Sequence, residues 1–98
     1  MLFAFIYHLK PTVNADDSRR LRRLFMSWEP PQGVDIKCHY AFARGGGVAI
    51  VDATSPSMIW ESLARFRPWV DIEVEPALSI VEALAISMDV DEWVDSIR

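Results

Sequence analysis

The sequence predicts an α+β fold, in which two helices cover one face of a four-stranded antiparallel sheet and a helical tail follows. Four short segments rich in aromatic and β-branched residues are typical of strands, and two segments carry apolar residues at helical spacing. Their order along the chain is strand–helix–strand–strand–helix–strand. With 98 residues, of which 51% are hydrophobic and 24% charged, the chain is expected to form one ordered domain.

The first strand is predicted over residues 2–9, where both alternating sets of side chains are apolar, as in a central strand that is covered on both sides. The first helix is predicted over residues 15–28. Asn14 can cap this helix together with Asp17 three positions later. Its apolar face has the spacing of one side of a helix and consists of Leu21, Leu24, Phe25 and Trp28.

The second strand is predicted over residues 34–43, which alternate strictly between two sets of side chains. The apolar set is Val34, Ile36, Cys38, Tyr40 and Phe42, and the opposite set is Asp35, Lys37, His39, Ala41 and Ala43. The glycines at 45–47 predict a hairpin turn that leads into a third strand over residues 48–53.

The second helix is expected to begin at Ser55 and Pro56, because proline after a capping residue favours a helix start, and to end at Pro68. Its apolar residues are Ile59, Trp60, Leu63, Ala64 and Phe66. Residues 69–75 alternate again and predict the fourth strand, which Pro76 closes.

Two short helices are predicted in the tail, one beginning at Ser79 with Glu82 in a capping box and one over residues 89–97. The second presents a narrow apolar stripe of Val90, Trp93, Val94 and Ile97. So short a helix is not stable alone in water, so we expect the stripe to dock on the same chain or on a second copy. The chain therefore divides into a domain over residues 1–78 and a C-terminal extension over 79–98.

The charge is unevenly distributed along a chain whose net charge is −4. Residues 1–68 hold 9 basic and 6 acidic groups, whereas residues 69–98 hold 1 basic and 8 acidic groups. The arginines of residues 19–23 are therefore candidate neighbours of the acidic tail. In an acidic molecule without an aromatic stacking platform, they favour a solvated helix face over a nucleic-acid site.

Right-handed crossovers place the first and third strands in the centre of the sheet and the other two at its edges, which is the ferredoxin-like βαββαβ plait. One sheet face is then left without helices. We expect this face to have an apolar centre and polar margins that include Lys37, His39, Asp71 and Glu73. Such a face is often closed by a second copy, so a homodimer is expected.

Three features of the sequence bear on where the protein is located and whether it binds a cofactor: its single cysteine, its apolar first residues and its glycine turn. The single cysteine, Cys38, cannot form an internal disulfide and favours a reducing cytoplasm. The apolar residues 1–7 are fewer than the roughly 20 that a membrane span needs and do not resemble a signal peptide. The glycine turn lacks the lysine of a phosphate-binding loop, so no cofactor is predicted.

Candidate catalytic residues are the two histidines, His8 and His39, together with Asp52 and Glu73 on other strands. Histidine suits proton transfer near neutral pH, and a neighbouring carboxylate fixes its tautomer. The alternative is that both are ordinary sheet histidines. The histidines lack the spacing of a zinc site, so no metal is predicted.

Three aromatic residues, Tyr7, Trp28 and Tyr40, are candidates to line a pocket for a flat substrate, with packing in the core as the favoured alternative. Cys38 lies on the apolar stripe of its strand. A structural thiol is therefore favoured over a nucleophile, which would need an accessible and electropositive setting.

The chain resembles a known family in five segments. They are MLFAFIYHLK at the start, Ser27 to Val34, VAIVDA with the following Ser55-Pro56, FRPWVDIEVEP from Phe66 to Pro76, and Glu82-Ala83. These segments are similar to a family of small proteins catalogued as a domain of unknown function, within the dimeric α/β-barrel superfamily. The resemblance covers residues 1–85 and leaves the tail from 86 to 98 as an addition.

The resemblance implies a dimer with a ligand cleft beside the sheet, in a superfamily that includes cofactor-free monooxygenases, haem-degrading enzymes, muconolactone-isomerase-like proteins and stress proteins. Two hypotheses follow. One is a cofactor-independent oxygenase or isomerase with His8 or His39 as base and Asp52 or Glu73 orienting it. The other is a non-catalytic binding or assembly module. A cavity that a histidine reaches favours the first hypothesis, and a filled core favours the second.

Overall fold

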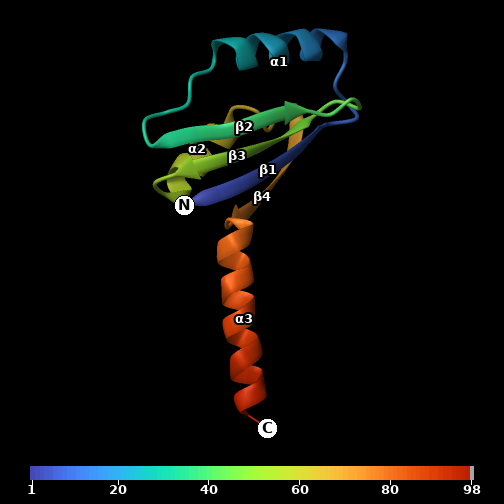
Figure 1. The fold of residues 1–98 in the computed structure, drawn as a ribbon. Coiled ribbons are helices and arrows are strands. Elements are labelled where there is room, and N and C mark those ends of the chain that lie inside the picture. The colour runs from blue at the N-terminus through green and yellow to red at the C-terminus, as the bar shows by residue number, and fades with distance from the viewer. Residues whose placement is uncertain (98) are drawn as a thin grey trace.

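A computed structural model describes residues 1–97 (Figure 1). The elements are β1 (Leu2–Leu9), α1 (Ala15–Ser27), β2 (Val34–Ala41), β3 (Gly47–Ala53), α2 (Pro56–Ala64), β4 (Val70–Ala77) and α3 (Ile80–Ser96). The strands form one antiparallel sheet in the order β2-β3-β1-β4. This confirms the predicted ferredoxin-like plait, with the first and third strands in the centre.

The helix starts follow from local chemistry. The Asn14 side chain accepts a hydrogen bond from the Asp17 backbone N–H at 2.9 Å, and the Asp17 carboxylate accepts one from the Asn14 N–H at 3.2 Å. This confirms the predicted cap of α1. Ser55 holds the capping position of α2, but its hydroxyl bonds to Ser57 rather than to the helix backbone.

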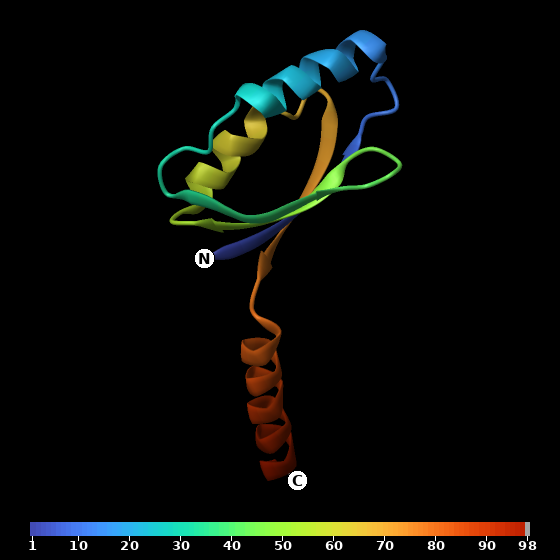
Figure 2. The same ribbon diagram turned by 45° about the horizontal axis from the view of Figure 1, so that its top comes forward.

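Both helices lie on the same side of the sheet (Figure 2). The covered face holds the core, which β1 and β3 form with α2 and which continues into a second cluster beneath α1. The buried apolar residues are Phe3, Phe5, Ala49, Val51, Ala53, Ile59 and Leu63 in the first cluster and Leu21, Phe66 and Val70 in the second. Phe5 of β1 pairs with Ala49 of β3 and with Val74 of β4, so these three side chains lie side by side on the covered face.

β2 contains an irregularity that its strict alternation does not predict. Ile36 pairs with Val51, and Cys38 pairs with the adjacent residue Ile50. Lys37 is therefore an extra residue without a partner in β3, which is a β-bulge.

The bulge reverses the facing of the rest of β2. His39 pairs with Ala49 and joins the covered face, whereas Cys38 and Tyr40 join the open face. The prediction that His39 lies on the polar, helix-free face is wrong, as is the placing of Cys38 and Tyr40 with Ile36. The physical reason is that side chains alternate with a period of two, so one inserted residue exchanges the two faces.

The open face has the predicted apolar centre. Its central side chains are Leu2, Ala4, Ile6, Val48 and Ile50, with Cys38 and Tyr40 from β2 beside them. Its margin on β4 is acidic and holds Asp71, Glu73 and Glu75.

The tail is one helix rather than the two that were predicted. No glycine or proline interrupts residues 80–96, so α3 runs through the second capping position. Ser79 accepts a hydrogen bond from the Glu82 N–H at 3.2 Å, as predicted. β4 likewise continues through Pro76 to Ala77, beyond its predicted end, because an edge strand tolerates proline.

α3 extends away from the rest of the fold, on the side of the sheet opposite to α1 (Figures 1 and 2). None of its residues is buried. The radius of gyration is 17.5 Å, whereas a compact chain of this length has about 13 Å. The tail is therefore not adjacent to the arginines of α1 within its own chain. No helix in residues 1–97 is both long and apolar enough to cross a membrane.

Candidate functional site

A cavity of about 190 Å³ lies between the covered face of the sheet and the helices. All four strands contribute to its wall, together with α1, α2 and the segments that follow them. Its largest apolar wall residues are Phe5, Phe25, Trp28, Ile36, Leu63, Phe66 and Ile72. An engineered apolar cavity of about 150 Å³ in another protein binds benzene, so this cavity has room for a single substituted ring.

Besides Trp28, whose indole N–H can only donate, three polar side chains line the cavity: Tyr7, His39 and Ser62. The Ser62 hydroxyl donates to the Met58 carbonyl at 2.8 Å and is satisfied within α2. The Tyr7 hydroxyl and His39 Nε2 lie 2.5 Å apart. The Tyr7–His39 pair therefore supplies the cavity wall with both a hydrogen-bond donor and an acceptor for a polar atom of a ligand.

The pair stands in an aromatic setting. Phe25 lies 6.0 Å from each of the two rings, measured between centroids, and stacks on Phe66 at 4.8 Å. His39 is exposed as a whole although it lines the cavity, which places it where the cavity meets solvent. The cavity therefore has an apolar interior and a polar pair at its opening.

Burial raises the pKa of Tyr7, so its phenol is neutral at physiological pH. A neutral imidazole carries one proton, and the contact allows two arrangements. Either Tyr7 O–H donates to an unprotonated Nε2, or Nε2–H donates to the Tyr7 oxygen. The pair can thus present to a ligand both a donor and an acceptor.

The raised pKa of Tyr7 predicts a loss of stability at alkaline pH. Its folded-state pKa lies above the ordinary value of about 10, so the contribution to stability is complete below that pH and is lost as the pH rises through the folded-state pKa. We expect the free energy of unfolding in urea to fall less steeply above pH 10 in Tyr7→Phe than in the wild type. Tyr40→Phe, on the open face, is the matched control and should keep the wild-type decline. An identical decline in all three proteins would contradict the prediction.

The structure does not bring the four predicted catalytic residues together. His39 lines the cavity, whereas His8, Asp52 and Glu73 lie on the open face. The His8 ring stacks on Phe42, with 5.8 Å between centroids. Within residues 1–97, no carboxylate forms an ion pair with either histidine.

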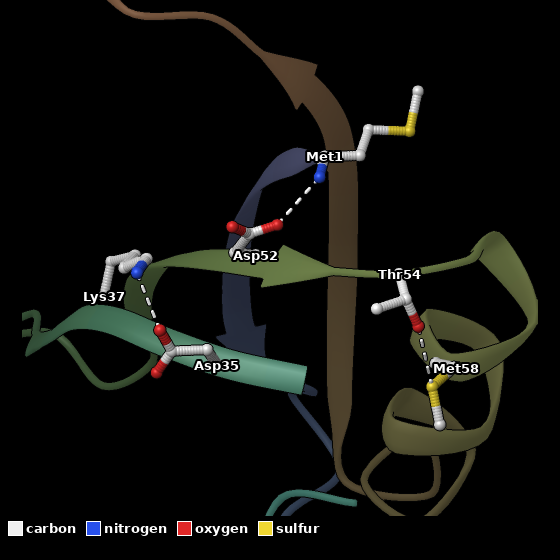
Figure 3. Close-up of polar contacts among 6 residues, drawn as sticks. All are labelled: Met1, Asp35, Lys37, Asp52, Thr54 and Met58. Carbon is white, nitrogen blue, oxygen red and sulfur yellow. Dashed lines mark hydrogen bonds and ion pairs between the residues drawn. The ribbon is translucent and has the colours of Figure 1, made fainter. Parts of the chain in front are cut away.

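Asp52 has a different partner. Its carboxylate accepts a hydrogen bond from the N-terminal ammonium of Met1 at 2.7 Å (Figure 3). That hydrogen bond and charge hold the pKa of Asp52 below its ordinary value. Figure 3 also shows the ion pair between Lys37 at the bulge and Asp35, at 2.7 Å. Asp35 and Asp52 belong to the open face, on the opposite side of the sheet from the cavity.

The role of Tyr7 as the partner of His39 was not predicted. Of the three candidate pocket aromatics, for which core packing was the favoured alternative, Tyr7 and Trp28 line the cavity and also pack against the core, whereas Tyr40 does neither. In the part of the chain that the structure describes, no three histidine, cysteine or acidic side chains are grouped to hold a metal ion. The predicted glycine turn is a hairpin, in which Phe42 N–H donates to the Gly46 carbonyl at 2.9 Å.

The model of a family described as a domain of unknown function (DUF3303) matches residues 1–91. No curated protein matches the chain. The family match continues into α3, past residue 85, where the resemblance was expected to end. Most of α3 is therefore part of the family's domain rather than an addition to it.

Proposed function

The chain belongs to the family described as a domain of unknown function (DUF3303). From its cavity we propose that it binds a small, largely apolar molecule. The observation that carries the proposal is the Tyr7–His39 contact of 2.5 Å at the opening of an otherwise apolar cavity. Ligand sites typically combine an apolar wall with a few placed polar groups.

The geometry defines the class of ligand. The volume of about 190 Å³ suits one ring with a short substituent. Rings of Phe25 and Phe66 favour a flat molecule, since aromatic pairs prefer offset or tilted stacking. A hydroxyl or carbonyl group on the ligand would bond to Tyr7 or His39.

The resemblance also implies catalysis of the oxygenase or isomerase type. Such catalysis would first require that a ligand bind against Tyr7 and His39. Without a carboxylate to orient it, His39 has Tyr7 as its only polar side-chain contact in residues 1–97. Binding is therefore the function that the geometry supports best.

Phenol and benzene are a matched pair of probes for this site, because they differ by one hydroxyl. We expect both to bind in the cavity and Tyr7→Phe to weaken phenol about fivefold while leaving benzene unchanged, since one hydrogen bond contributes about 1 kcal/mol. Binding is followed by NMR shifts of the methyl groups of Leu63 and Ile72, which line the cavity.

The control for this experiment is Tyr40→Phe, which removes an exposed hydroxyl from the open face and should change neither affinity. Shifts confined to residues outside the cavity wall would contradict the proposed site. An equal loss of phenol and benzene affinity in Tyr7→Phe would contradict the polar role of the pair.

We also propose that the protein is a homodimer closed through the open sheet face, as in the superfamily that it resembles. Support comes from the apolar centre of that face, which includes Ala4, Ile6 and Ile50, and from its acidic margin on β4. Exposed apolar patches with polar rims are typical of interfaces. The unpaired thiol of Cys38, half-buried on this face, suits the reducing cytoplasm that we propose as the location.

A further inference from the structure

α3 carries an apolar seam that its own chain does not cover. The seam alternates steps of three and four residues, which is the spacing of a helix that packs along a second element. Its members are Ala83, Ile86, Val90 and Trp93, followed by Ile97 at the C-cap. The last four are between 50% and 63% exposed. A seam of this kind is unusual on a surface that remains in water.

The helix also has little to stabilise it alone. Its 17 residues exceed by little the length of about 12–15 below which isolated helices are marginal in water. Residues 80–96 contain no basic residue, so no ion pair between neighbouring turns supports it. Asp91, Glu92 and Asp95 lie near its C-terminus, where negative charge opposes the helix dipole. An ordered α3 therefore needs a partner.

The exposed area of the chain indicates how large the missing contact is. The surface measures 7429 Å², whereas a compact monomer of this size exposes about 5,700 Å². The excess is about 1,700 Å². A stable interface buries about 800 Å² on each partner, so this chain exposes enough additional surface for a dimer.

Charge and chain continuity favour a second copy as the partner. α3 carries five acidic residues, and the arginines at 20, 22 and 23 of α1 have no ion pair within residues 1–97. Each copy thus brings both an acidic helix and a basic one, and such complementarity promotes association. β4, the edge of the open face, leads through Leu78 and Ser79 directly into α3. A copy seated on the open face therefore meets the base of this helix.

We infer that α3 is an exchanged arm, which packs its seam on the second copy of the chain in the homodimer. The inference rests on the proposed dimer but not on the proposed ligand. It assigns to α3 an interaction surface with Trp93 as its largest side chain, and tryptophan is among the residues that most often dominate the affinity of interfaces.

The full-length chain tests the inference in a dilution series that combines light scattering with amide hydrogen exchange. We expect a mass of two chains at high concentration, with protected amides in residues 84–96, and a joint loss of both on dilution. Trp93→Ala should raise the dimer dissociation constant at least about tenfold. Trp60→Ala is the matched control, since Trp60 is 63% and Trp93 62% exposed and both lie on helices. The control should leave the constant unchanged.

Other outcomes would overturn the inference in distinguishable ways. A mass of two chains with unprotected α3 amides would contradict the exchanged arm but agree with a dimer closed through the open face. A mass of one chain with protected amides means that α3 docks on its own domain, and both the arm and the dimer fail. A mass of one chain with unprotected amides would also contradict both the arm and the dimer. A different protein would then be the candidate partner of the seam.

Discussion

Gly46→Ala is expected to lower the free energy of unfolding by about 2–5 kcal/mol, the sum of about 1–2 kcal/mol of left-handed backbone strain and about 1–3 kcal/mol of overpacking. Gly46 has a φ of +88°, and a Cβ there would overlap the Tyr7 carbonyl oxygen and approach His8 Cα to 2.9 Å. Both obstacles are backbone atoms of the central strand β1, which cannot rotate away. The variant must therefore displace the hairpin from the strand that carries Tyr7.

Gly45 provides the matched control, because its φ of +94° is nearly the same. A Cβ at Gly45 would meet the Leu9 side chain, with Cδ1 at 3.0 Å, and that side chain can move. Gly45→Ala should cost only the conformational strain of about 1–2 kcal/mol. Urea unfolding of both variants and the wild type measures the difference. Equal losses in the two variants would contradict the close approach of Gly46 to the backbone of β1.

Ile50→Glu is expected to convert the proposed homodimer into a monomer. Ile50 lies at the centre of the open face, between Ala4 on β1 and Cys38 on β2. In a dimer closed through this face, the new carboxylate would be buried without a partner, and an unpaired buried charge costs several kcal/mol. In the free chain, the same side chain reaches water, so the fold should persist.

Light scattering at micromolar concentration is the measurement for Ile50→Glu, with circular dichroism to verify that the chain is folded. Ala64→Glu adds the same charge at an exposed position of α2 and should keep the mass of two chains. A wild-type mass of one chain, or a folded Ile50→Glu with the mass of two chains, would contradict closure through this face.

The elements that the sequence predicted well are those decided by local chemistry. The cap of α1 forms because Asn14 and Asp17 are three residues apart, and the hairpin forms because glycine tolerates the positive φ of its turn. The strand order follows from the handedness of crossovers, which is a property of twisted strands rather than of this sequence. These features needed no information about distant contacts.

The features that were missed depend on contacts distant in sequence. Residues 34–43 alternate without interruption, so nothing in their pattern marks Lys37 as the bulged residue. Asp52 looked available to orient a histidine, but it pairs with the ammonium of Met1. The Tyr7–His39 contact joins β1 to β2, which are not neighbours in the sheet, so neither spacing nor pairing could predict it.

The bulge in β2 separates the residues whose facing is set by the hairpin, His39 among them, from those that precede Lys37. β2 has 8 residues and β3 has 7, and the difference is taken up at Lys37. From the hairpin to the bulge, the pairing of His39 with Ala49 is set by the turn alone. The imidazole therefore keeps its facing independently of how the chain enters β2. Changes of length before Lys37 can be absorbed at the loop and the bulge without turning His39 out of the cavity.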